Sequence, residues 1–178
     1  IKFNKKLFSI SINRYWKFKE NLKNNISNNS MKIEDEIESI LQNSIKNQLH
    51  ADVPVGVFLS GGIDSSLVAA ISKIYDDKIN TFSIGFNDLD FNEAESSKKI
   101  ANYIGTKHNE FYLSSKNALD LIPKMHEIYC EPFGDSSQIP TYLISKIARE
   151  NVKVILSGDG GDELFGGYNR YKYFHQIY

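Results

Sequence analysis

The sequence predicts an α/β fold in which a parallel sheet carries helices on both of its faces. Short apolar runs rich in β-branched and aromatic residues alternate along the chain with longer segments of helical periodicity. The first and the last of these runs each lead into a glycine-rich segment, 60–62 and 157–161. Strands joined through helices pair in parallel with right-handed crossovers, and the helices then bury both faces of the sheet.

The composition indicates a water-soluble globular protein. The chain has 178 residues, of which 41% are apolar and 24% charged, and this is enough for one domain with a core. A net charge of −1 gives no basic surface for nucleic acid, and no apolar run approaches the ~20 residues that a membrane helix needs. The single cysteine, Cys130, excludes an internal disulfide and favours a reducing compartment such as the cytoplasm.

The N-terminal segment differs from the rest of the chain in being rich in lysine and asparagine. We expect residues 1–30 to form a linker or arm, a partly disordered tether from an N-terminal domain that is absent here. Apolar side chains then recur at helical spacing from Ile33 to Leu49, which predicts an amphipathic helix over 31–50. Because both ends look cut, we expect residues 31–178 to be one domain, truncated at its C-terminus.

The remaining elements follow from the same patterns. Strands are predicted at 55–59, 79–86, 108–113 and 152–156, and an aromatic stretch with helical character ends the chain at 168–178. Helices are predicted at 64–74, 92–105, 117–129 and 138–150. Gly105 is expected to cap the second of these, and Ser136 or Ser137 the last, with Pro140 in its first turn.

The segment 60–66, Ser-Gly-Gly-Ile-Asp-Ser-Ser, connects the first predicted strand to its helix. Its glycines permit a tight turn, and backbone N–H groups at a helix start favour an anion. The hydroxyls of Ser60, Ser65 and Ser66 add further donors, so the segment predicts a pyrophosphate cradle. It has neither the Walker P-loop pattern nor the dinucleotide pattern, and an ordinary glycine-rich turn is the alternative.

The second informative segment, 157–168, follows the last predicted strand and carries three acids, Asp159, Asp162 and Glu163. Phosphates repel carboxylates, so an acidic loop beside a phosphate site implies a cation between them. Mg²⁺ takes one or two carboxylates together with phosphate oxygens and water, and Asp64 and Asp162 could hold it jointly. The alternatives are a solvated turn or a calcium loop, although the spacing does not match an EF-hand.

Together these segments carry a resemblance to a known family. Segment 60–66 resembles the PP-loop of the ATP pyrophosphatases, which have the adenine nucleotide alpha hydrolase-like, Rossmann-like fold. With Ser-Gly-Asp-Gly-Gly-Asp-Glu-Leu-Phe-Gly-Gly-Tyr at 157–168, and with 81–86, 105–108, 131–135 and 140–142, the chain is similar to the synthetase domain of glutamine-dependent asparagine synthetases.

The resemblance implies ATP and Mg²⁺ as ligands and gives the motif residues roles. Asp64 and Asp162 would share the Mg²⁺, and Asp159 is a candidate catalytic residue at a position where many family members carry Glu. The residues expected to bind ATP are Leu59, Ser60, Gly61, Gly62, Asp64, Ser65, Ser66, Ile84, Ser157 and Gly158. Outside the motifs, we expect His108, His126, Cys130 and the tyrosines after 167 to be structural.

Enzymes of this family activate the side-chain carboxylate of aspartate as an acyl-adenylate, release pyrophosphate and let glutamine-derived ammonia displace AMP. The resemblance implies the same ligase reaction here, with aspartate or a related carboxylate as substrate and a glutaminase domain of the same polypeptide as partner. It is compatible with a homodimer. That domain and a downstream family lysine lie outside the sequence, so we expect the chain alone to be inactive. Amidation of another carboxylate, such as one on a sugar, and a non-catalytic nucleotide-binding module remain open.

Overall fold

The computed structural model describes residues 1–14, 30–87, 92–131 and 134–173, and the chain divides into two units, Ile1–Ser39 and Ile40–Tyr178. In the first unit, β1 (Lys2–Asn4) and β2 (Ser9–Ser11) pair as an antiparallel hairpin. Asn4 Oδ1 accepts hydrogen bonds from the two following backbone N–H groups of the turn, at 3.1 and 3.2 Å. The composition of residues 1–30 did not predict this hairpin; residues 15–29 lie outside the described part.

Helix α1 (Ser30–Leu49) begins in the first unit and ends in the second, close to the predicted 31–50. Its second half presents one apolar stripe to the core of the second unit. Ile45 is buried there, with Leu41 and Leu49 packed beside it. The four- and three-residue spacing of these side chains is the reason that the helix was predictable.

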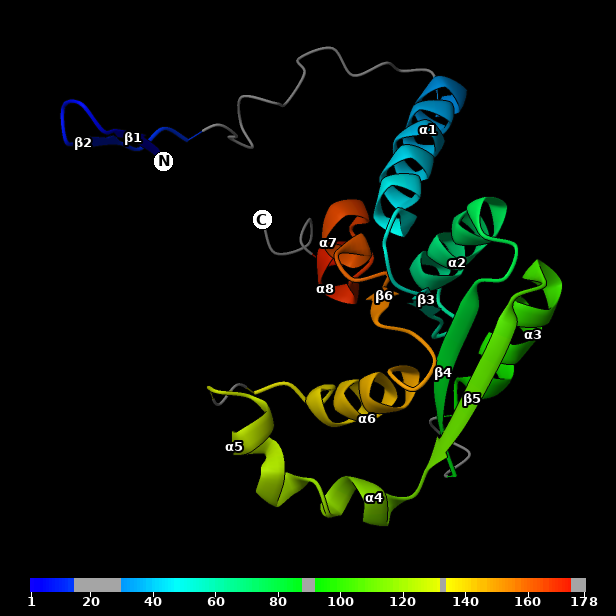
Figure 1. Cartoon of the computed structure of the whole chain (residues 1–178). Helices are drawn as coiled ribbons and strands as arrows, with labels where there is room; N and C mark the ends of the chain where they lie inside the picture. The colour runs from blue at the N-terminus through cyan, green and yellow to red at the C-terminus, as the bar shows by residue number, and fades with distance from the viewer. Residues whose placement is uncertain (15–29, 88–91, 132–133, 174–178) are drawn as a thin grey trace. The chain divides into compact units, whose positions relative to one another are not determined.

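The second unit is built on a four-stranded sheet with strand order β5-β4-β3-β6 (Figure 1). All three neighbouring pairs run parallel, which confirms the predicted parallel sheet. The strands are β3 (Val55–Phe58), β4 (Asn80–Phe86), β5 (Lys107–Leu113) and β6 (Val154–Leu156).

Helices cover both faces of this sheet, as predicted. Figure 1 shows α2 (Ile63–Tyr75) and α3 (Ala94–Ile104) on one side and α6 (Gln138–Ala148) on the other. The alternation of side chains along β3 divides the core accordingly. Val55 and Val57 join the cluster formed with α1, α2 and α3, whereas Phe58 packs on the cluster around α6. Gly105 ends α3 in a left-handed conformation, φ 81°, as expected of a C-cap.

The prediction of one helix over 117–129 is wrong. The segment forms three short pieces: α4 (Ser115–Leu119), the 3₁₀ turn η3 (Ile122–Lys124) and α5 (Met125–Ile128). Pro123 lies in the first turn of η3, where its missing N–H is tolerated, and a proline in the middle of an α-helix would remove a backbone hydrogen bond. Ser114 begins α4 with a capping box that includes Asn117.

The last elements differ from the prediction at their ends. Helix α6 stops at Ala148 rather than 150, and β6 starts at Val154 rather than 152. Ser137 is the residue before α6, but its side chain makes no capping bond; its N–H instead donates to Asp135 Oδ1 at 2.8 Å. This bond lowers the pKa of the Asp135 carboxyl. Two short helices follow, α7 (Gly161–Phe165) and α8 (Asn169–Lys172), while residues 174–178 lie outside the described part.

The centre of β3 tests how tightly the sheet is packed. A Cβ at Gly56 would lie 2.7 Å from Cε2 of Phe82 and 3.1 Å from Cδ1 of Ile155. We expect Gly56→Ala to lower the free energy of unfolding by about 1–3 kcal/mol, because overpacking displaces both side chains. In Gly134→Ala, the control, the added Cβ meets no atom within 4 Å, so the change should stay within about 0.5 kcal/mol. Urea denaturation measures both, and equal stabilities would contradict the tight packing of β3.

Candidate functional site

The strand order of the sheet marks where a ligand should bind. From β3 the chain proceeds outward through β4 to β5 and then returns to place β6 on the other side of β3. The order therefore reverses between β3 and β6, and parallel sheets bind ligands outside the carboxyl ends of the strands at such a switch point. The segments that leave the sheet there are 59–62 and 157–161, the two segments that the sequence singled out.

The first loop turns sharply from β3 into α2. Gly61 adopts φ 81°, a left-handed conformation that a side chain would strain. Gly62 is the N-cap of α2 and has no side chain with which to cap it, so amides of the first helical turn are left for an anion. The turn also packs on the next helix, since a Cβ at Gly61 would lie 3.1 Å from Ser96 Cβ of α3.

The three hydroxyls of this loop converge as predicted, but they bond within the loop. The oxygens of Ser60 and Ser65 are 3.0 Å apart, and Ser65 Oγ also accepts from the Ser60 N–H at 3.2 Å. Ser66 Oγ donates to the carbonyl of Gly62 at 2.6 Å. A phosphate in the cradle would compete with these bonds and could take the same donors with little movement of the backbone.

The second loop lies directly against the first. A Cβ added at Gly158 would come within 2.8 Å of the Ser65 nitrogen and 3.0 Å of Asp64 Cβ. One added at Gly161 would lie 2.5 Å from the Asp64 carboxylate. Residues other than glycine at these two positions would push the loops apart, so the glycines are needed for this close approach. The structure thus brings together two segments that lie about a hundred residues apart in the sequence.

The acids of the second loop differ in their hydrogen-bond partners. Asp159 Oδ2 accepts a hydrogen bond of 2.9 Å from Ser157 Oγ, and Glu163 Oε1 accepts one of 2.6 Å from the Tyr168 hydroxyl. Within the described part of the chain, the carboxylates of Asp64 and Asp162 make no hydrogen bond or ion pair; that of Asp162 lies beside Gly167. These two carboxylates therefore keep their oxygen lone pairs for another ligand.

The donor chemistry suits a hard cation bound with phosphate. Among the described residues, no group of three or more His, Cys, Asp or Glu side chains is arranged to hold a metal ion. A metal here would thus depend on one or two carboxylates and on oxygen atoms of a ligand, which is the coordination typical of Mg²⁺. Gly161 brings only backbone, and no side chain, against the Asp64 carboxylate.

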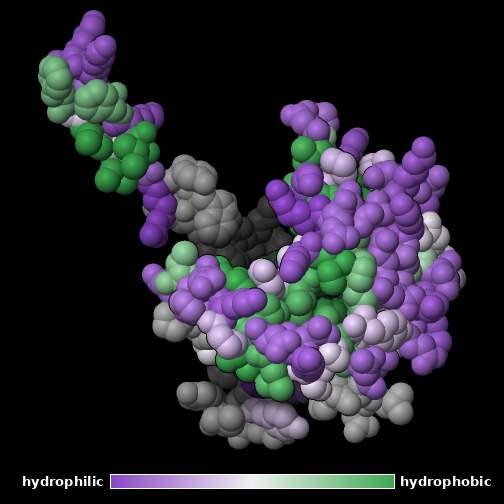
Figure 2. All heavy atoms as spheres, turned by 60° about the horizontal axis from the view of Figure 1, so that its bottom comes forward, coloured by the Kyte–Doolittle hydropathy of each residue, from purple (hydrophilic) through white to green (hydrophobic). Residues whose placement is uncertain are grey.

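A pocket of about 170 Å³ opens next to the two loops. Four of the predicted site residues line it, namely Asp64, Ser157, Gly158 and Asp159. Its other walls are mainly apolar and come from α1, α2 and α7, including Leu41, Ile45, Leu67, Val68, Leu164 and Phe165. Figure 2, with the lower end of Figure 1 turned forward, likewise shows hydrophobic side chains in the middle of the second unit, bordered by hydrophilic ones.

Two predicted ATP-binding residues lie at the edge of this arrangement. Leu59 is buried at 1% exposure in the core, so a ligand could reach only its backbone. Ile84 lies on β4, and its side chain packs with the cluster around α6 rather than with the two loops. A nucleotide bound at the loops would therefore meet Leu59 and Ile84 only on the side of the site that the sheet forms.

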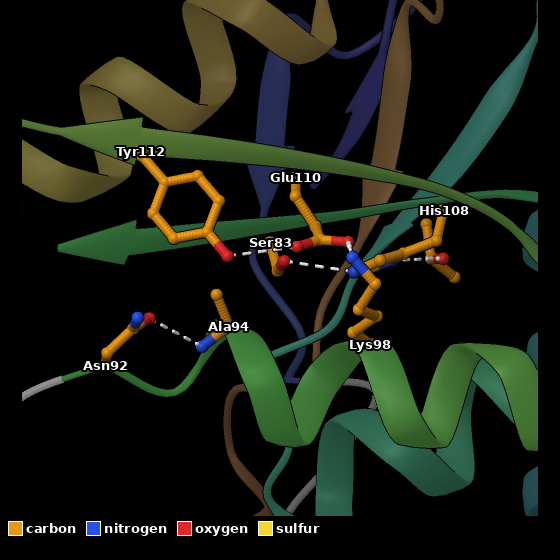
Figure 3. Close-up of polar contacts among 8 residues, drawn as sticks. Ser83, Asn92, Ala94, Lys98, His108, Glu110 and Tyr112 are labelled. Carbon is orange, nitrogen blue, oxygen red and sulfur yellow. Dashed lines mark hydrogen bonds and ion pairs between the residues drawn. The ribbon is translucent and has the colours of Figure 1, made fainter. Parts of the chain in front are cut away.

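A polar cluster lies between α3 and the strands β4 and β5 (Figure 3). His108 on β5 bonds through Nδ1 to Thr81 Oγ1 at 2.9 Å and through Nε2 to Ser83 Oγ at 3.1 Å. In the same cluster, Lys98 of α3 pairs with Glu110 at 2.9 Å, and this contact lowers the pKa of Glu110 and raises that of Lys98. His108 is a structural residue, as the sequence suggested.

The sequence did not reveal how α7 and α8 are joined. Tyr168 donates to Glu163, which lowers the pKa of Glu163 and raises that of Tyr168. The guanidinium carbon of Arg170 lies 4.4 Å from the centroid of the Tyr168 ring and 5.5 Å from that of Tyr171. The five-residue spacing of Glu163 and Tyr168 was the available signal, but it becomes meaningful only once the chain turns between α7 and α8.

The fold and the two loops at its switch point define an α/β domain of the PP-loop type. A glutamine-dependent NAD⁺ synthetase from Acinetobacter baumannii, solved in complex with ADP, has a similar fold with a TM-score of 0.56 and 17% identity. The match covers 83% of this chain and 29% of that one. At this identity the likeness shows the fold, and it confirms the predicted fold class.

The family is shown by the sequence comparisons. The asparagine synthase family model matches residues 36–177, and the chain belongs to this family. It is 40% identical over 129 residues to asparagine synthetase [glutamine-hydrolyzing] 1 of Bacillus subtilis, covering 72% of this chain and 20% of the relative. It is 36% identical over 152 residues to asparagine synthetase B of Escherichia coli, covering 75% and 26%. The chain thus spans a fifth to about a quarter of the length of these relatives. None of the described helices is both long and apolar enough to cross a membrane.

The half-buried His108 gives the fold a pH dependence. Burial lowers the pKa of His108 from its usual 6.5, Glu110 opposes this shift and Lys98 adds to it. Because the folded-state pKa is the lower one, the unfolded chain binds the proton first as the pH falls. The stabilisation is therefore complete above about pH 6.5 and is lost progressively below it.

We expect His108→Gln to lose part of the decline in stability that the native chain shows between about pH 7.5 and 5.5. His126→Gln is the matched control, because His126 is exposed and should leave the decline unchanged. Urea denaturation at both pH values measures the difference. The same decline in His108→Gln as in the native chain would show that the buried imidazole is not its source.

Proposed function

We propose that the chain is the ATP-binding synthetase domain of an AMP-forming amidotransferase. The reaction is asparagine synthesis from aspartate, ATP and glutamine-derived ammonia, through β-aspartyl-AMP. The observation that carries the proposal is the contact of Gly158 and Gly161 with Asp64. Through this contact the acidic loop after β6 lies against the loop after β3, which is the proposed phosphate cradle. Membership of the asparagine synthase family supports the same reading.

The first loop would bind the phosphates of ATP. The backbone N–H groups of Gly61 and Gly62 and the hydroxyls of the three serines offer donors to phosphate oxygens. The N–H of Leu59 donates to the Phe82 carbonyl at 2.8 Å, so Leu59 would border the phosphates without donating to them. Ser157 and Gly158 would contact the nucleotide from the second loop, and Ile84 would border the adenine or ribose. Holding the pyrophosphate leaving group in this way favours cleavage between the α- and β-phosphates, because the negative charge that develops there is met by fixed donors.

Asp64 and Asp162 would hold Mg²⁺ between the loops. A bound Mg²⁺ would neutralise charge on the phosphates, which the acidic loop would otherwise repel. Asp159, at the mouth of the pocket and bonded to Ser157, would be positioned toward the reacting carboxylate. Its assignment as a catalytic residue remains part of the proposal.

The proposal extends to the protein that contains this chain. A glutaminase domain of the same polypeptide would supply ammonia, and the enzyme would work in the cytoplasm, with a homodimer compatible. The relatives are named as glutamine-hydrolysing, which supports the first point. Amidation of a different carboxylate is the second candidate function. It is supported by Asp159, which stands where many family members carry Glu, because the shorter acid alters the shape of the acceptor side of the site.

The decisive test measures exchange of labelled pyrophosphate into ATP by the full polypeptide that contains this chain. With Mg²⁺ and aspartate, we expect exchange at least about tenfold above that without aspartate, because adenylation of the side-chain carboxylate is reversible. AMP, not ADP, should be the nucleotide product. Exchange with another carboxylate alone would move the acceptor to the second candidate, and ADP formation would contradict the proposal.

The metal assignment predicts unequal effects of two neighbouring acids. Asp162→Asn keeps the shape and removes the charge, so we expect adenylation to fall by about 10²-fold or more, or about 3 kcal/mol. Glu163→Gln keeps an oxygen that can accept from Tyr168, so it is the control and should change the rate by less than about threefold. Both variants should unfold within about 0.5 kcal/mol of the native chain. Pyrophosphate exchange and melting curves measure both effects. An active Asp162→Asn with an inactive Glu163→Gln would show that the metal is assigned to the wrong acid.

A further inference from the structure

One aspartate of the second loop differs from every other aspartate of the sequence in the residue that follows it. Asp159 is the only aspartate or asparagine that directly precedes a glycine. The backbone nitrogen that follows an aspartate can attack the side-chain carboxyl, and glycine favours this ring closure because no Cβ shields its nitrogen. A Glu, which many family members carry here, would have to close a larger ring. The step from Asp159 to Gly160 is therefore chemically suited to this reaction.

The local structure leaves the attacking nitrogen accessible. Asp159 and Gly160 are both exposed to solvent. Among the described residues, no oxygen accepts a hydrogen bond from the Gly160 N–H. Gly160 adopts φ 91°, and a Cβ built on it would meet no atom within 4 Å. The backbone around this nitrogen can thus rearrange without breaking a hydrogen bond of the N–H or a packing contact.

The other aspartates of the second unit are held differently. Asp135 precedes a serine, and its carboxylate accepts a backbone N–H at 2.8 Å. Asp64 and Asp162 lie in the first turns of α2 and α7, where the helical backbone directs the next nitrogen along the helix axis. The Asp159 carboxylate is held by the 2.9 Å bond from the Ser157 hydroxyl, which restrains one oxygen and leaves the carboxyl carbon open to attack.

We propose that Asp159 is a site of spontaneous isoaspartate formation and that this change inactivates the site between the two loops. The Gly160 nitrogen attacks Cγ of the protonated Asp159 carboxyl. A new C–N bond forms, and the proton of the nitrogen leaves with the carboxyl hydroxyl as water, which gives a succinimide. Water then opens the ring. Cleavage at Cγ restores aspartate, and cleavage at the α-carbonyl gives isoaspartate, so the reaction needs no co-reactant other than water.

Isoaspartate at this position would change the path of the main chain. The chain would run through Cβ and Cγ, which adds one atom between residues 159 and 160 and leaves the carboxylate directly on Cα. The contacts on either side are tight, since a Cβ at Gly158 would lie 2.8 Å from the Ser65 nitrogen and one at Gly161 2.5 Å from the Asp64 carboxylate. The added atom lies between these two contacts and would separate the loops. For the activity that is lost, the proposal rests on the proposed function.

Peptide mapping of the full polypeptide tests the reaction without reference to any activity. The protein is kept in mildly acidic buffer at physiological temperature for several weeks and digested, and electron-transfer fragmentation then locates isoaspartate. We expect at least about tenfold more isoaspartate at Asp159 than at Asp64, Asp135 or Asp162, which serve as controls within the same sample. The variant Asp159→Glu should form no isomerised residue at 159. Equal amounts at the four aspartates, or none at Asp159, would overturn the proposal.

The same samples show whether the change inactivates the site. When half of Asp159 is isomerised, we expect pyrophosphate exchange to fall by about twofold, because only the unmodified molecules turn over. Treatment with protein isoaspartate methyltransferase and S-adenosylmethionine, which converts isoaspartate back to aspartate, should restore the exchange. Full exchange in a half-isomerised sample would overturn the inactivation. If the fresh polypeptide shows no exchange, the proposed function fails, and the peptide map alone then decides whether Asp159 is the modified residue.

Discussion

The pairing of β3 with β6 is the constraint on which the site depends. The two strands are joined in register, Val57 opposite Leu156, although about a hundred residues separate them in the sequence. Both strands therefore leave the sheet at the same level and in the same direction, and the loops that follow them meet where Gly158 and Gly161 lie against Asp64. β4 and β5 extend the sheet on the far side of β3, so no other strand intervenes where the loops meet.

Support for the cradle comes from packing that has no ligand role. Helix α3 lies against β4 and β5 over a small polar interface, where His108 bonds to the hydroxyls of Thr81 and Ser83. These short side chains let the helix come close to the sheet, and its Ser96 then stands against Gly61 of the cradle. The two bonds of the imidazole join β5 to β4, and the ion pair of Lys98 with Glu110 joins α3 to β5. The cluster thus helps to hold α3, whose Ser96 borders the loop, on the sheet.

The sequence predicted most of the fold because the information was local. Period-two and period-3.6 apolar patterns located the four parallel strands and the main helices, and the glycine and acid motifs located both loops. The elements that the sequence failed to predict lie where two local sequence patterns favour different structures. The apolar spacing across 117–129 suggested a helix, but Pro123 and the turns around it divide the segment. Ser137 occupies the N-cap position of α6, as predicted, although its side chain makes no capping bond. The hairpin was hidden by a lysine- and asparagine-rich composition, since its apolar residues form a face only after the strands pair. That Asp64 would touch Gly161 could not be foreseen from either motif alone, because the contact is set by the sheet register.

The three acids of the second loop are chemically alike but are not equivalent once folded. The Asp159 carboxylate already accepts a hydrogen bond from Ser157, and the Glu163 carboxylate accepts one from Tyr168. The Tyr168 bond favours the charged form of Glu163 and thereby lowers the pKa of its carboxyl. A cation that recruited Glu163 would have to compete with the Tyr168 bond and with Arg170, which stacks on that tyrosine. Asp162 carries no such bond among the described residues and follows directly after Gly161, the residue in closest approach to Asp64. The neighbours of each carboxylate, rather than its position in the motif, therefore favour Asp64 and Asp162 as the pair that a cation would join. In this arrangement Glu163, Tyr168 and Arg170 join α7 to α8, and the Asp162 carboxylate lies beside Gly167 in the turn between the two helices.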